Sequence, residues 1–156
     1  MDETPVHRYR ATCNWSGSTG AGYEHYARDH SLSAAPAAAI IDASSDPAFH
    51  GDPTRLNPEQ LLVMAAASCQ MLSFLAIAAR KRIDVVEYVD QAEGYMPEAD
   101  QPMRITRIVL RPRIVITGSG DREQIQKMIE LAHRQCFIAN SLKTDIEIEA
   151  SMEFRA

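Results

Sequence analysis

The feature that most constrains this chain is an apolar stretch from Leu61 to Ala79, whose only polar members are Ser68, Gln70 and Ser73. A helix of this length is long enough to span a bilayer, and a membrane span is therefore one interpretation. The preferred prediction is a buried helix, because Gln70 lies at its middle and the flanking segments are typical of strands in a soluble fold. A helix that is apolar on all faces must be covered by protein, so we expect a subunit partner to supply part of the cover.

Local signals mark where this helix begins and ends. Asn57 can cap the helix, Pro58 suits a first turn that does not need its N–H, and Glu59 favours the positive end of the helix dipole. The basic run over residues 80–82 suits the negative end. We therefore predict a helix over these limits, preceded by a long polar loop over residues 42–56.

The rest of the chain shows mainly the period of two that half-buried strands have. We expect strands over residues 7–15, 22–32, 37–41, 83–95, 104–116 and 143–154, and a second, amphipathic helix from Asp121 to about Gln135. Pro112 inside the fifth strand predicts an edge position or a bulge. The order of elements predicts an α+β fold with antiparallel sheets, as a single domain over residues 1–156.

The composition excludes several classes of protein. Lys and Arg number 16 against 21 Asp and Glu, a formal net charge of −5, which argues against a dedicated nucleic-acid binder or a polybasic membrane binder. Three cysteines do not make a disulfide framework. Residues 1–10 lack the apolar segment of a signal peptide. Since reactive thiols need a reducing pool for turnover, we expect a cytoplasmic protein.

The three cysteines differ in what they predict. Cys13 shares the apolar side of its strand and is expected to pack there. Taken alone, Cys69 and Cys136 are also typical of buried, unreactive thiols. The pair His133 and Cys136 is half of a zinc pattern, but no second pair completes it, so we expect no metal. Phosphate-binding loops, dinucleotide fingerprints and serine nucleophile motifs are also missing from the sequence.

Two blocks of sequence resemble the OsmC/Ohr family of osmotically inducible and organic hydroperoxide resistance proteins. The first block runs from Asn-Pro-Glu-Gln-Leu-Leu at residues 57–62 to Ala-Ala-Ser-Cys at residues 66–69. The second is Ala-His-x-x-Cys at residues 132–136, with Asn140 close behind. The resemblance covers nearly the whole chain, and it implies an intertwined homodimer whose sheets wrap around two central helices.

The resemblance also implies a two-cysteine peroxidase cycle without a bound cofactor. By this analogy Cys69 is the peroxidatic thiol that becomes a sulfenic acid, and Cys136 is the resolving thiol that condenses with it to a disulfide. An external dithiol, of the lipoyl type in the family, restores both thiols. A thiol with an ordinary pKa of about 8.5 is mostly protonated at neutral pH, so a cation must favour the thiolate.

The chain departs from the family at this cation. The family uses an arginine held by the glutamate at the helix start, which Glu59 matches, but its usual turn after the first strand holds no arginine here. Arg28 and Arg55 are the candidate replacements, with solvated surface side chains as the alternative. Gln70 stands where an aromatic residue or histidine is often found, and Phe137 follows the second cysteine where many members have proline.

Three classes of function follow from these residues. The leading prediction is a thiol-dependent peroxidase that reduces organic hydroperoxides or peroxides generally. The missing turn arginine motivates the second class, a non-catalytic protein of the same fold that binds a small apolar ligand in the dimer cleft. The third is a structural or stress-induced protein whose cysteines only pack in its core.

Overall fold

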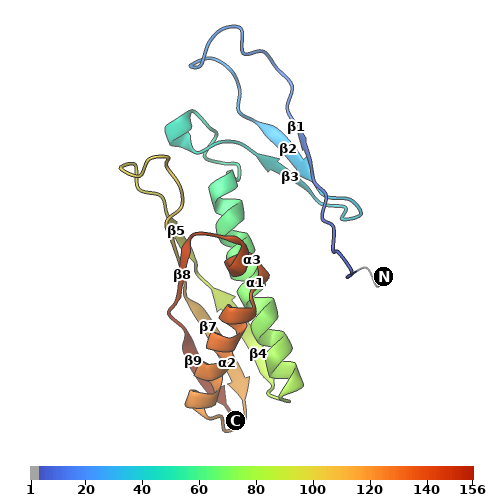
Figure 1. Cartoon of the computed structure of the whole chain (residues 1–156), viewed down its shortest axis with the longest axis vertical. Coiled ribbons are helices and arrows are strands. Elements are labelled where there is room, and N and C mark those ends of the chain that lie inside the picture. Colours follow the sequence, from blue (N-terminus) through green and yellow to red (C-terminus); the bar gives the residue numbers. More distant parts are fainter. Residues whose placement is uncertain (1–3) are drawn as a thin grey trace. The chain divides into compact units, whose positions relative to one another are not determined.

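The computed structural model describes residues 4–156. Contacts divide the chain into two compact units, one ending at Pro58 and one running from Glu59 to Ala156 (Figure 1). The single domain expected from the sequence stays a prediction.

The N-terminal unit is a three-stranded antiparallel meander, as the sequence predicts. Its strands are β1 (Thr12–Asn14), β2 (His30–Ser33) and β3 (Ile40–Ala43), in the order β1-β2-β3, and a single 3₁₀ turn, η1 (Pro47–Phe49), follows. The strands are shorter than predicted, because turns occupy most of residues 17–27. Cys13 of β1 lies opposite Leu32 of β2 and is exposed, so the expected packing of this thiol is wrong.

The long apolar segment forms α1 (Pro58–Arg80), whose limits match those predicted. Pro58 occupies the first helical position, and the chain leaves the helix through Arg82, whose φ of 56° is left-handed. Among the described residues, α1 is the one helix long and apolar enough to cross a membrane, and 28% of its most apolar window is buried within this chain. Most of its surface therefore still needs cover.

The second unit contains two mixed sheets and two further helices. One sheet has the order β4-β7-β9 and the other β5-β6-β8. The strands are β4 (Val85–Asp90), β5 (Glu93–Tyr95), β6 (Arg107–Leu110), β7 (Pro112–Thr117), β8 (Asp145–Ile148) and β9 (Ser151–Arg155). The helices are α2 (Arg122–Gln135), at the predicted position, and α3 (Phe137–Ser141).

The α+β class is confirmed, but purely antiparallel sheets are wrong for this unit. β6 pairs with β8 in parallel, and so does β7 with β9. The reason is the connection through α2 and α3, which returns the chain to the end of the sheet where it started, as a helical crossover does. The antiparallel pairs are β4 with β7 and β5 with β6.

Each of the three long strands predicted in this unit is split between the two sheets. The breaks fall after Asp90, at Arg111 and after Ile148. Pro112 is therefore the first residue of a strand, where its missing N–H costs no ladder bond. At this corner the Arg111 N–H donates to Oδ1 of Asp90 over 2.7 Å, and the Glu149 N–H donates to the Leu110 carbonyl over 2.8 Å.

Two clusters of buried side chains hold α1 on the sheets. The C-terminal half of α1 contributes Phe74, Ile77 and Ala78 to a cluster with α2, β4, β7 and β9, and Figure 1 shows α2 alongside this half. Further toward its N-terminus, Ala66 packs on Ile108 and Leu110 of β6. The middle of α1, which carries Cys69, therefore lies between the two clusters.

A two-cysteine candidate site beside an apolar groove

Cys136 is buried at the junction of α2 and α3. It is 1% exposed and serves at once as the C-cap of α2 and the N-cap of α3. Its backbone N–H donates to the His133 carbonyl over 3.2 Å, and its Sγ accepts from the Ala139 N–H over 3.4 Å. The extended backbone at Cys136 ends α2 and turns the side chain toward α1.

The structure brings Cys136 together with Cys69 of α1. Cys69 lines one groove with Gln135 and Phe137, the residues on either side of Cys136, and the two thiols lie close enough to influence each other's protonation. Both thiols are free. Burial raises the pKa of the Cys136 thiol, and the contact with Cys69 raises it further, while the hydrogen bond from Ala139 opposes both. Cys136 is thus a protonated, enclosed thiol, and the partly exposed Cys69 is the sulfur that a molecule from solution reaches first.

A groove of about 670 Å³ with largely apolar walls leads to Cys69. Its walls come from α1 on one side and from the α2–α3 junction on the other. They comprise Leu72, Ser73, Ala76 and Arg80 of α1 together with Gln135, Phe137 and Asn140. Phe137 is 79% exposed, so this aromatic ring is available to pack against the organic part of a bound molecule.

Gln70, next to Cys69, is a buried polar residue for which no role in the site was predicted from the sequence. Its side chain is 1% exposed, and its Nε2 donates to the carbonyl oxygen of Ile129 in α2 over 3.2 Å. Its Oε1 has no hydrogen-bond partner among residues 4–156. The available signal was an amide in the middle of an apolar helix, because such a group needs a polar partner when buried.

Arg28 belongs to the N-terminal unit and is held there by its own neighbours. Its guanidinium carbon lies 3.7 Å from the ring centre of Tyr26 and 4.7 Å from that of Tyr23. Its terminal nitrogens donate to the carbonyl oxygens of the same two tyrosines. Arg28 is 9% exposed, so the solvated surface side chain considered from the sequence is wrong for this residue.

Arg55 also belongs to the N-terminal unit, where it faces carboxylates. It pairs with Asp29 at 3.3 Å, Asp52 at 3.5 Å and Asp42 at 3.7 Å. Hydrogen bonds from Thr54, and then the charge of Arg55, hold the pKa of Asp52 below its ordinary value. Glu59 lies in the first turn of α1, ten residues from Cys69, so about 15 Å of helix separates them and they do not touch.

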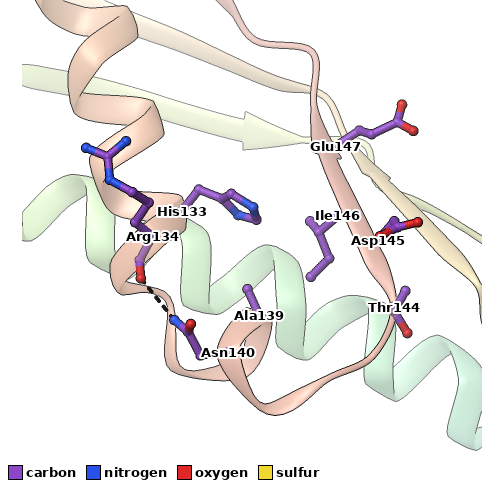
Figure 2. A pocket seen from close by; sticks show the side chains of 8 residues that line it. All are labelled: His133, Arg134, Ala139, Asn140, Thr144, Asp145, Ile146 and Glu147. Carbon is purple, nitrogen blue, oxygen red and sulfur yellow. Dashed lines mark hydrogen bonds between the residues drawn. The ribbon is translucent and has the colours of Figure 1, made fainter.

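A second, more polar pocket of about 780 Å³ lies between the α2–α3 junction and β8. Figure 2 shows the His133 ring pointing across it toward Ile146, while the charged ends of Arg134 and Glu147 point away. Asn140 donates to the Arg134 carbonyl over 3.0 Å, and Nδ1 of His133 has no partner within the described residues. No group of three or more potential metal ligands occurs among residues 4–156.

Known proteins share this arrangement of elements. An OsmC-like protein of unknown function from Vibrio cholerae is 32% identical, covers 94% of this chain and 100% of that chain, and superposes with a TM-score of 0.84. An organic hydroperoxide resistance protein OsmC from Legionella pneumophila, 15% identical with a TM-score of 0.66, covers 96% of this chain and 99% of that chain. At that identity the likeness shows the fold alone.

A curated relative is less similar. The uncharacterized protein YmaD of Bacillus subtilis is 21% identical over 96 residues, which cover 60% of this chain and 64% of YmaD. The match therefore spans less than two thirds of that relative. The model of the OsmC-like protein family matches residues 50–151, well over half of the chain and including both cysteines of the site. On this match, the chain belongs to the OsmC-like protein family.

Proposed function

We propose that this protein is a thiol-dependent peroxidase that reduces organic hydroperoxides through Cys69 and Cys136. The observation that carries the proposal is the proximity of these two thiols, which come from segments 67 residues apart in sequence and meet at one groove. The apolar groove beside Cys69 supports an organic substrate. The name of the Legionella protein of the same fold, an organic hydroperoxide resistance protein, supports the same substrate class.

In the first step the Cys69 thiolate attacks the terminal oxygen of the hydroperoxide. The O–O bond breaks, sulfur loses two electrons, and the organic part leaves as an alcohol after taking a proton. Arg28 and Arg55 remain the proposed sources of the positive charge that favours the thiolate, with Glu59 as the carboxylate that orients it. The groove supplies an apolar surface for the alkyl or aryl group of the substrate.

In the second step Cys136 attacks the Cys69 sulfenic acid. An S–S bond forms, and the sulfenic oxygen leaves as water after the Cys136 thiol gives up its proton. Because burial raises the pKa of Cys136, this thiol is protected from direct oxidation until a sulfenic acid forms beside it. An external dithiol of the lipoyl type then restores both thiols, without a bound cofactor, in a reducing compartment such as the cytoplasm.

The test is a titration of the reduced protein with cumene hydroperoxide. We expect two of the three thiols to disappear for each equivalent consumed, and peptide mapping without reductant to show Cys69 linked to Cys136. Cys13, which is exposed but has no thiol partner among the described residues, is the internal control and stays free. Consumption without this link removes Cys136 from the cycle, and a protein that consumes no hydroperoxide favours the non-catalytic ligand-binding alternative.

We also propose that the protein works as an intertwined homodimer in which α1 of one protomer is covered by the other. Buried residues lie along one side of α1, whereas Met64 is 49% and Leu72 is 60% exposed. Apolar surface of this extent on a helix needs cover by protein. Sedimentation equilibrium is expected to give twice the chain mass of 17.3 kDa at micromolar concentration, and a monomer there contradicts the proposal.

A further inference from the structure

Gln70 is placed where it contributes little to stability. Its Nε2 reaches the Ile129 carbonyl, but its Oε1 is buried without a partner within residues 4–156. A buried amide that satisfies one of its two polar ends still carries the desolvation cost of the other. An apolar side chain of similar volume at this position removes that cost, so the stability of the core does not account for the amide.

The hydrogen bond from Gln70 to Ile129 involves residues near the two cysteines along both helices. On α1, Gln70 directly follows Cys69. On α2, Cys136 comes seven residues after Ile129, about two helical turns, so both fall on nearly the same side of the helix. Ala132, between them, is buried on that side as well. The bond therefore joins the two helices one residue from Cys69 on α1 and about two turns from Cys136 on α2. Adjacent residues of a helix point about 100° apart, so Gln70 faces the buried side of α1 while Cys69 faces the groove.

Apolar side chains of both helices pack against one another in this region. Phe74, Ile77 and Ala78 of α1 share a cluster with Ile125, Met128, Ile129 and Ala132 of α2. Apolar contacts of this kind are not directional, so they set the distance between helices more strongly than the slide or rotation of one on the other. The Gln70 bond joins one donor to one acceptor, so it restrains both the slide and the rotation of α2 on α1.

We propose that Gln70 is a positioning residue whose bond to Ile129 fixes α2 on α1, so that the sulfur atoms of Cys69 and Cys136 meet. A disulfide requires Cα atoms within about 4.4–6.8 Å, and a slide by one residue moves a helix by about 1.5 Å. Its catalytic consequence rests on the proposed function. The positioning itself is measurable without a hydroperoxide, because oxidised glutathione also closes the disulfide.

The test compares the wild type with Gln70→Met, which has similar volume and no amide donor. In the glutathione equilibrium the two thiols lose two electrons and two protons, and one oxidised glutathione becomes two reduced ones. We expect the variant to favour its disulfide about tenfold less, because departures from disulfide geometry store strain that makes the bond easier to reduce. Tenfold corresponds to a potential about 30 mV less negative.

Stability separates positioning from a purely structural role. The reduced Gln70→Met protein is expected to unfold at the wild-type temperature or higher, and Gln126→Met, the same change on the exposed face of α2, alters neither readout. An unchanged potential in Gln70→Met overturns the proposal. So does a variant that unfolds at lower temperature or fails to fold, because Gln70 is then a stabilising core residue.

A hydroperoxide arm keeps this proposal distinct from the proposed function. With cumene hydroperoxide, Gln70→Met is expected to form the Cys69 sulfenic acid at the wild-type rate but to leave more of it for capture by dimedone. Equal capture in both proteins counts against positioning. A wild type that consumes no hydroperoxide, while the glutathione potential still shifts in Gln70→Met, refutes the peroxidase and leaves the positioning role standing.

Discussion

Cys69→Ser is expected to reduce the rate of hydroperoxide consumption to that of the reaction without protein, while Cys136→Ser retains a single turnover. Serine has a hydroxyl in place of the thiol and so offers no thiolate to attack the O–O bond, and the first step is lost. Without Cys136, the sulfenic acid forms once and has no neighbouring thiol to condense with. The measurement is cumene hydroperoxide consumed per protein, with limiting and with excess dithiothreitol.

Cys13→Ser is the matched control for both substitutions, since it removes a thiol from the N-terminal unit. It should retain the wild-type rate. If Cys69→Ser also retains that rate, the two sulfur atoms meet for a reason other than peroxide reduction. If Cys136→Ser turns over at the full rate with excess dithiothreitol, the external dithiol reduces the sulfenic acid directly.

Phe74→Ala is expected to cost about 3–5 kcal/mol of unfolding free energy, as truncation of a fully buried aromatic residue does. Phe74 is 0% exposed, its ring centre lies 5.9 Å from that of Tyr88, and it belongs to the cluster that joins α1 to α2. Urea unfolding monitored by circular dichroism measures the change. Val86→Ala, at a position 51% exposed on the neighbouring strand, is the control and should cost no more than about 1 kcal/mol.

A loss below about 1 kcal/mol in Phe74→Ala would mean that the cluster collapses around the missing ring with little cost. The cysteine site provides a second readout of the same variant. Because Phe74 lies on α1 one turn beyond Gln70, loosening this cluster is also expected to weaken the contact between Cys69 and Cys136.

The helices were predictable because their signals are local. Pro58 at the first turn and the apolar run after it define α1 without reference to the rest of the chain. Asp121 does the same for α2, where its carboxylate accepts the Glu123 N–H over 2.9 Å. Capping and periodicity act over a few residues, and the sequence displays both directly.

The division of the long strands was not predictable in this way. Inside–outside alternation continues unbroken from Asp145 to Phe154, although β8 ends at Ile148 and β9 belongs to the other sheet. A bend that preserves the alternation does not interrupt the two-residue period, so the sequence pattern gives no sign of it. β8 pairs in parallel with β6, and β9 with β7. Each partner strand lies about 40 residues earlier in the chain, and a local sequence pattern does not encode such contacts.

The site was predictable only in part. The resemblance to a family singled out Cys69 and Cys136, and the structure brings them together. The apolar groove and the bond from Gln70 depend on how α2 lies on α1, which no single segment specifies. Arg28 shows the same limit, because its carbonyl and tyrosine partners are set by the turns of residues 23–26 and not by a strand pattern.

The strand order has a consequence for synthesis on the ribosome. Both sheets of the second unit receive one outer strand from residues 145–155, β8 in one sheet and β9 in the other. Neither sheet can be completed until residues 145–155 have left the exit tunnel, although α1 has emerged long before. The nascent chain therefore carries an uncovered apolar helix through much of its translation. During this interval the exposed apolar surface favours aggregation, which chaperones prevent.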